Sequence, residues 1–423
     1  MGVSATTDPT LATPETGGRP GVDPARSRHV GLALVALAMG GFAIGTTEFV
    51  SMGLLPQLAA GVGVSIPTAG HVISAYAVGV VVGAPLIAVF GARLPRRGVL
   101  VGLMGVFLLG NAASALATGY GSLVLARFLA GLPHGAYFGV ASLVAADLVA
   151  PHRRGRAVSR VMLGLAVANV AGVPVATYLG QAFGWRSAYW LVAGLAAATV
   201  ALVVWLVPHT AGNREATGRN ELRAFRSPQV LLTLLAGAMG FGGMFAMYTY
   251  IAPTVTEVAG LPESRVPFYA LAFGLGMVVG TPLAGRLADW SVFRSMIVGS
   301  VLMGLALAAF TVTAQWFLPG LLTVFTITTV SSVLVVGLQM RLMQVAGDAQ
   351  TIGAAMNHAS LNIANALGAW LGGVVVAAGF GYTATSWVGA GLSVAGLLVL
   401  LVSAALHRRG WVGREAQPAS VGA

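Results

Sequence analysis

The 423-residue sequence contains no cysteine, which excludes disulfides, thiol catalysis and cysteine-ligated metal sites. Lysine is also absent, so all 23 basic residues are arginines. Charged residues make up only 8% of the chain, against roughly 25% in soluble domains, and this excludes an ordinary soluble protein. The net charge of +11 does not indicate a nucleic-acid partner, because the arginines lie in short segments between hydrophobic runs, where they orient membrane proteins.

The sequence is instead rich in long hydrophobic segments. Hydrophobic residues make up 57% of the chain, and 58 residues are glycine, which allows membrane helices to approach closely. Twelve segments have the length of a membrane-spanning helix. The first six lie at 29–52, 68–91, 98–118, 122–149, 158–181 and 186–207, and the second six at 230–251, 267–288, 294–314, 317–342, 352–378 and 383–406.

The polar segments between these spans predict the domain organisation. Residues 1–28 are expected to be a disordered tail and not a signal peptide, since no short apolar core with a cleavage site precedes the first span. A central loop at 208–229 separates two six-helix bundles at 29–207 and 230–407, and 408–423 form a second tail. The tails and even-numbered turns hold 20 of the 23 arginines, so the positive-inside rule places both termini in the cytoplasm.

The two halves repeat each other at an offset of 197 residues. Residues 81–86, VVGAPL, match residues 278–283, VVGTPL. In the same register Gly40, Gly45 and Pro56 match Gly237, Gly242 and Pro253, and with a one-residue slip Ala168, Asn169 and Gly172 match Ala364, Asn365 and Gly368. A register held over several spans indicates parallel repeats related by an axis along the membrane normal.

One acid, Glu48, lies well inside a predicted span. A buried acid is costly in hydrocarbon, and such residues commonly move protons or ions, although a buried ion pair that only joins helices is the alternative. Glu48 lies 17 residues beyond Gly31, roughly 25 Å along the helix, and Arg127 lies roughly 7 Å below the opposite boundary near Ser122. The two therefore fall at similar depth. Arg127 is the expected partner, favouring ionised Glu48 while burial favours the protonated form.

Local motifs give the chain a family resemblance. They are Gly45-Thr46-Thr47-Glu48-Phe49, Gly83-Ala84-Pro85-Leu86 followed by 92–97 (ARLPRR), 125–131 (LARFLAG), and Gly172-Val173-Pro174 with Gly180. Over residues 30–407 the sequence resembles the major facilitator superfamily, near its drug:proton antiporters and the arabinose-efflux and chloramphenicol-efflux permeases. The resemblance implies an all-α integral membrane protein with twelve transmembrane helices in two six-helix parallel repeats.

The same resemblance implies a function. It is export of small amphipathic drugs or metabolites in exchange for protons by alternating access, in the bacterial inner membrane. The implied protein is a monomer with no cofactor, and the proton gradient is its energy source. Because Glu48 is the one acid well inside a span and Arg127 is expected beside it, we expect neutral substrates.

The predicted inner gate departs from the superfamily pattern in the first half. The pattern has an aspartate after the small residues of the 2–3 loop, where this sequence has Ala92. The second-half copy keeps it, so the gate is expected at Arg286 and Asp289 more than at Arg93. Arg96 and Arg97 are interpreted as topology signals.

Span 5 carries small residues at every fourth position, namely Gly164, Ala168, Gly172, Ala176 and Gly180. This spacing predicts one smooth stripe for close helix contact, and span 11 repeats it with Ser360, Ala364, Gly368 and Gly372. The resemblance implies that the first stripe is the antiporter motif, in which a kink at Pro174 helps to seal one side. Close packing alone is the alternative, and both can hold.

The second half is predicted to form an adaptable substrate wall. Its candidate residues are Met244, Met247, Tyr248 and Tyr250 in span 7, and His358, Asn362 and Asn365 on one face of span 11. Soft methionine and aromatic surface with a few polar groups suits varied apolar ligands, and ordinary helix packing is the alternative. His134 follows Pro133 and could relay protons or simply pack.

Other functions remain open. The same fold exports sugars or nucleosides in other members of the family. An intramembrane enzyme would need clustered catalytic groups at one depth, which Glu48 alone does not supply. A channel is disfavoured by the two-fold repeat and by the lack of a ring of like charges.

Overall fold

The computed structural model describes residue 2 and residues 24–91, 94–150, 153–209, 227–345 and 350–408. Regular structure in these residues is helical, and 12 helices are long and apolar enough to cross a membrane. They match the predicted spans to within a few residues, so the prediction of an all-α membrane fold is confirmed. The first helix begins at Pro24, inside the segment predicted to be a tail.

The spans of the first half are α1 (Pro24–Gly53), α3 (Ile66–Gly91), α4 (Arg96–Ala115), α5 with α6 (Tyr120–Gly131 and His134–Asp147), α7 with α8 (Arg154–Val167 and Val173–Phe183) and α9 (Arg186–Leu206). Those of the second half are α11 (Pro228–Thr249), α13 (Val266–Trp290), α14 (Val292–Thr313), α15 (Phe317–Val345), α16 (Gln350–Ala377) and α17 (Ala384–Arg408). The short helices α2 (Leu55–Val62) and α12 (Ile251–Pro253) extend α1 and α11.

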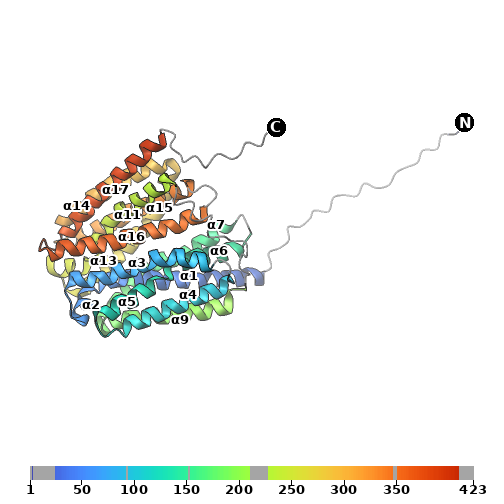
Figure 1. The fold of residues 1–423 in the computed structure, drawn as a ribbon, viewed down its shortest axis with the longest axis horizontal. Helices are drawn as coiled ribbons and strands as arrows, with labels where there is room; N and C mark the ends of the chain where they lie inside the picture. Colours follow the sequence, from blue (N-terminus) through green and yellow to red (C-terminus); the bar gives the residue numbers. More distant parts are fainter. Residues whose placement is uncertain are drawn as a thin grey trace.

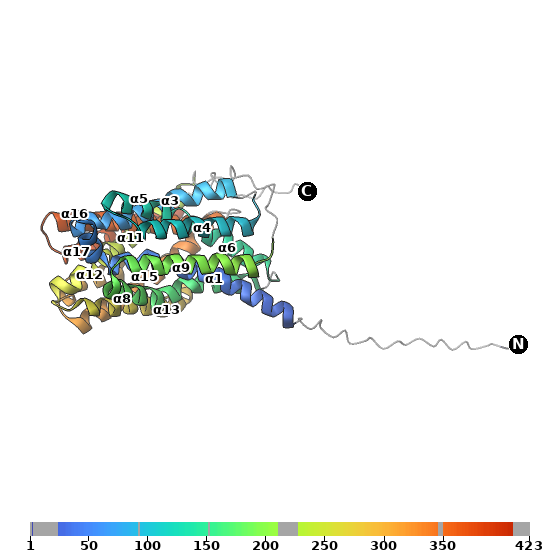
Figure 2. The same cartoon turned by 90° about the horizontal axis from the view of Figure 1, so that it is seen from below.

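The helices run roughly side by side in one bundle (Figures 1 and 2). The helices of the first half, blue to green, pack beside those of the second half, yellow to red. The halves meet where α3 contacts α16 and where α13 contacts α8 and the turn before it. We call the end where α1 begins and α17 ends the terminal end, and the end that carries α2 and α12 the distal end (Figure 2).

Two spans are interrupted at prolines. Pro133 lacks a backbone N–H, and the fourth span breaks there into α5 and α6. In the fifth span a π-helical turn at Ala168–Gly172 stands between α7 and α8, just before Pro174. A proline clashes with the carbonyl four residues earlier, and the wider π turn accommodates it. Such turns are frequent at functional sites.

The small-residue stripe of the fifth span packs against α1. A Cβ at Gly164 would overlap the carbonyl of Ala38, and one at Gly180 would overlap Leu54. Gly172 is equally tight against Thr46. The predicted close helix contact is therefore present. The helix that packs against the stripe is α1, which also carries Glu48.

The matching stripe on α16 packs against α11. A Cβ at Gly368 would overlap the carbonyl of Gly242, and one at Gly372 would contact the ring of Tyr250. The sequence repeat is thus a repeat of packing, with span 5 against span 1 and span 11 against span 7.

In the second span Gly83 lies directly on the backbone of Leu132, at the break between α5 and α6.

Candidate transport site

Arg127 is a completely buried cation held in a fixed position. Its Nη1 donates to the Thr47 hydroxyl at 2.9 Å, and its Nη2 donates to the Thr47 carbonyl at 3.1 Å. The guanidinium carbon lies 4.4 Å from the ring centroid of Tyr76 and 5.2 Å from that of Tyr189. The Thr47 hydroxyl in turn donates to Oδ1 of Asn111 at 2.6 Å. The sequence predicted Arg127 at this depth but none of these four neighbours.

Glu48 lies next to this network without joining it. The residue is only 8% exposed, and among the described residues its side chain makes no hydrogen bond and no ion pair within 4 Å. The expected direct contact with Arg127 is therefore not formed. An α-helix has about 3.6 residues per turn, so Thr47 and Glu48 point in different directions, and it is Thr47 that faces Arg127. The Glu48 carboxyl is thus buried without a bonded counter-ion in the part of the chain that the structure describes.

A second polar group lies between the halves and contains His134. The hydroxyl of Tyr76 shares a hydrogen bond with Nδ1 of His134 at 3.0 Å. The His134 ring centroid lies 6.3 Å from that of His358 on α16, whose ring stacks on Phe138 at 5.3 Å and 4°. His358 was predicted to line the substrate cavity with Asn362 and Asn365. The structure places it against the fourth span.

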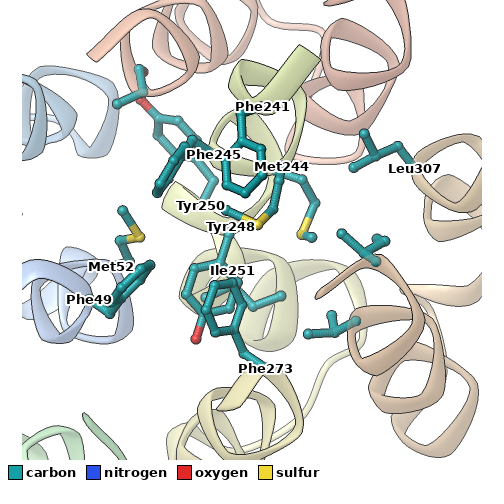
Figure 3. Close-up of a cluster of buried hydrophobic side chains, with 14 of the residues drawn as sticks. Phe49, Met52, Phe241, Met244, Phe245, Tyr248, Tyr250, Ile251, Phe273 and Leu307 are labelled. Atoms are coloured by element: carbon teal, nitrogen blue, oxygen red, sulfur yellow. The ribbon is translucent and has the colours of Figure 1, made fainter. Parts of the chain in front are cut away.

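The span-7 residues Met244, Met247 and Tyr248 belong to an apolar cluster that both halves build (Figure 3). Phe49 of α1 lies 5.1 Å from Phe273 of α13 and 6.3 Å from Tyr248, and Tyr248 lies 4.1 Å from Phe273, all between ring centroids. We call Phe49, Phe245, Tyr248 and Phe273 the aromatic seal. It lies near the distal ends of α1 and α11, where residues of both halves are in contact.

A hydrogen-bonded latch reinforces the closed distal end. Nε2 of Gln57 on α2 donates to Oε2 of Glu263 at 2.7 Å, and Nε2 of Gln181 on α8 donates to the Glu263 carbonyl at 2.9 Å. Glu263 precedes α13, so both bonds join one half to the other. No sequence pattern indicated this latch, because polar residues are common in every turn.

Tyr250, predicted to line the cavity, is a helix-packing residue in the structure. Its hydroxyl donates to the carbonyl of Ala369 at 2.9 Å, which ties α11 to α16, and its ring lies against Gly372. The small residues on α16 leave room for the ring, and this explains why Tyr250 faces α16.

The amides of span 11 are buried and incompletely bonded. Nδ2 of Asn362 donates to the carbonyl of His358 at 2.9 Å, but its Oδ1 has no partner among the described residues. Within the same ranges, both amide atoms of Asn365 are buried without a partner. A buried polar group left unpaired costs about 1–3 kcal/mol, so these amides are groups that a bound ligand could satisfy.

Comparison with known proteins decides the family. The model of the major facilitator superfamily matches residues 37–357. The chain belongs to the major facilitator superfamily. It is 41% identical over 369 residues to the Inner membrane transport protein YdhP of Escherichia coli K12, covering 87% of this chain and 94% of the relative. It is 35% identical to the Chloramphenicol resistance protein of Streptomyces lividans, covering 83% and 90%.

The solved structures agree on the fold. The crystal structure of D-xylose-proton symporter superposes with a TM-score of 0.73 over 89% of this chain and 97% of that chain, at 16% identity. The protein is therefore a multi-pass membrane transporter of small molecules and not an enzyme. The predicted resemblance to the efflux members of this superfamily is confirmed.

The gating residues are only partly described. Arg286 is exposed near the terminal end of α13, while the side chains of Asp289 and Pro85 and the whole of Arg93 lie outside the described residues. The gate at Arg286 and Asp289 stays a prediction. Arg96, expected to act on topology alone, forms an ion pair with Asp147 that joins the start of α4 to the end of α6.

Proposed function

We propose that this transporter exports small neutral amphipathic molecules in exchange for protons, with Glu48 as the proton-carrying group. The observation that carries the proposal is Glu48 itself, a buried acid without a bonded counter-ion. An ion pair that only held helices together would be bonded directly to Arg127. A free acid beside a fixed cation is instead suited to gain and lose a proton.

Alternating access fits the two ends of the molecule. The aromatic seal and the Glu263 latch close the distal end, and both are built from residues of the two halves. Because these contacts join one half to the other, a rocking motion of the halves would break them together. The small-residue stripes on α7–α8 and α16 pack against α1 and α11 of the same half, so each half is suited to move as a unit.

The charges favour neutral substrates. Arg127 is fixed and positive, so protonation of Glu48 leaves a net charge of +1 near the path. A cation held 6 Å from that charge would be repelled by roughly 2–3 kcal/mol at an effective dielectric near 20, about fifty-fold in affinity. Neutral compounds with hydroxyl or amide groups avoid this cost and can bond to Asn362 and Asn365. The Streptomyces relative named for chloramphenicol resistance supports a substrate of this kind.

The substrate prediction is tested in a bacterial strain that lacks its own efflux pumps. Expression of the chain is expected to raise resistance to chloramphenicol at least severalfold and to cause little efflux of ethidium, a permanent cation. An empty vector and the Glu48→Gln variant are the controls. Strong ethidium efflux without protection against chloramphenicol would contradict the charge argument.

A sugar or nucleoside exporter is the second candidate. The unpaired amide atoms of Asn362 and Asn365 favour it, because a ligand rich in hydroxyl groups would bond to them. Transport assays in proteoliposomes with labelled arabinose and labelled chloramphenicol distinguish the two. Saturable arabinose transport without chloramphenicol transport would assign this alternative.

We also propose that the protein lies in the bacterial inner membrane as a monomer without a cofactor, with the terminal end in the cytoplasm. The arginine distribution supports this orientation. Single cysteines at Thr217 and Ser420, which lie outside the described residues, are expected to resist impermeant thiol reagents in intact cells. A cysteine at Ser65, exposed at the distal end, should react readily. Labelling of Thr217→Cys or Ser420→Cys in sealed cells would reverse the orientation.

A further inference from the structure

We propose that Tyr76, His134 and His358 form a proton route that leads from Glu48 to the terminal end. The inference rests on the proposed proton coupling at Glu48 and adds the path by which the proton leaves. It also assigns a role to two residues, Tyr76 and His358, that the coupling site alone does not use.

The four groups lie at successive depths. At about 1.5 Å per residue, Glu48 lies roughly 8 Å from the distal end of α1 at Gly53, and Tyr76 roughly 15 Å from the distal end of α3 at Ile66. His134 lies roughly 21 Å below Tyr120, and His358 roughly 29 Å below Ala377. The series therefore crosses most of a hydrocarbon core of about 30 Å in one direction.

A hydrogen bond and a ring contact connect Tyr76, His134 and His358, and Glu48 adjoins them through Thr47 and Arg127. Arg127 lies over the Tyr76 ring at 4.4 Å and is bonded to Thr47, the neighbour of Glu48. The Tyr76 hydroxyl is bonded to Nδ1 of His134 at 3.0 Å. The rings of His134 and His358 lie 6.3 Å apart between centroids, and the proposed route places one bridging water between their nitrogens. In the described part of the chain, no hydrogen bond occupies Nε2 of His134 or either ring nitrogen of His358.

The surroundings of the His134 and His358 rings favour transient passage of a proton over a lasting imidazolium. Of the ring neighbours of the two imidazoles, Phe138 is apolar and Tyr76 is a member of the route. Among the described residues, no carboxylate or guanidinium bonds to His134 or His358. A lasting imidazolium there would be an unpaired buried charge, so the proton would reside on Glu48 or leave.

The transfer conserves protons at each step. The carboxyl proton of Glu48 passes through water to the Tyr76 oxygen, while the Tyr76 hydroxyl proton moves to Nδ1 of His134. His134 gives its Nε2 proton through water to His358, which releases one proton to water at the terminal end. Each of the three relay groups gains and loses one proton, and the net products are the Glu48 carboxylate and one released proton. A flip of the His134 ring and rotation of the Tyr76 hydroxyl then restore the starting arrangement without moving the proton back.

Two substitutions remove the polar atoms of the route and keep its packing. Tyr76→Phe preserves the ring beneath Arg127, and His358→Phe preserves the stack on Phe138. His71→Phe is the matched control, since His71 bonds to the Tyr120 hydroxyl at 2.9 Å near the distal end, away from the route.

The experiment compares two rates in proteoliposomes with labelled chloramphenicol as the probe. One is accumulation driven by a pH gradient, and the other is exchange at equal pH, which moves no net protons. The ratio of driven rate to exchange rate is expected to fall roughly tenfold or more in Tyr76→Phe and in His358→Phe. The double variant should fall no further, because both act on one route. His71→Phe should match the wild type.

The outcomes separate the route from the coupling. An unchanged ratio in both variants, with Glu48→Gln inactive in driven transport, would overturn the route and leave the proposed function standing. Equal loss of exchange and driven transport in both variants would also overturn it, since that pattern marks a structural role. Normal driven transport by Glu48→Gln would reject the coupling itself. If one variant does not fold, the other still decides.

Discussion

Replacing Glu48 by glutamine is expected to abolish accumulation of substrate against its gradient while exchange across the membrane continues. Glutamine keeps the size of the side chain and its place beside Thr47 but cannot release a proton. Since Glu48 has no bonded partner among the described residues, the change breaks no hydrogen bond or ion pair that holds the fold. The expected loss of gradient-driven transport is about 100-fold or more, the range of a positioned proton-transfer group.

The control for this variant is Glu257→Gln. Glu257 is an exposed acid at the distal end, in the turn that follows α12, and its neutralisation should leave driven transport unchanged. Transport is measured with purified protein in proteoliposomes, alongside thermal denaturation to confirm folding. If Glu48→Gln concentrates substrate as the wild type does, Glu48 is structural and the proton-carrying role is wrong.

Replacing Arg127 by alanine is expected to produce the largest loss of stability of any single substitution at the site. The change removes two hydrogen bonds to Thr47 and two stacking contacts with Tyr76 and Tyr189, and it leaves a cavity where a completely buried side chain lay. Truncating one member of such a buried charged network typically costs about 3–5 kcal/mol. Driven transport should fall as well, because Glu48 loses the nearby cation that favours its ionised form.

Two comparisons make the Arg127 result interpretable. Arg127→Lys keeps the charge but not the planar fork that bonds twice to Thr47, so it should recover part of the stability. Arg186→Ala removes an arginine that also bonds to a carbonyl and stacks on Trp185, but at the distal surface, where the cost should be below about 1 kcal/mol. Thermal denaturation in detergent measures all three. A melting temperature for Arg127→Ala equal to that of Arg186→Ala would contradict the network.

The fold was predictable because membrane spans are encoded by composition over a long window. Hydropathy located the 12 spans, and the 197-residue repeat indicated matching halves. The repeat also predicted that span 11 would pack as span 5 does. The π turn before Pro174 could not be predicted from the sequence. A proline indicates that the helix is disturbed, but it does not indicate which irregular turn accommodates it.

The sequence predicted the depth of Glu48 and Arg127 in the membrane but not the side-chain contacts that they make. Counting residues along two helices placed Arg127 level with Glu48, yet a difference of one position decided that Thr47 receives its hydrogen bonds. The bond between Tyr76 and His134 and the latch from Gln57 to Glu263 join residues 58 and 206 positions apart. No local pattern encodes such pairs, since each depends on how separate helices pack.

The measurement that tests the central claim most directly is uptake of labelled chloramphenicol into proteoliposomes under an imposed pH gradient. With an acidic interior, protons leaving through the protein should drive the compound inward, and accumulation should vanish at equal pH or with a protonophore. The account predicts this accumulation for the wild type and none for Glu48→Gln. Equal accumulation with and without the gradient, or accumulation only when the exterior is acidic, would contradict proton-coupled export.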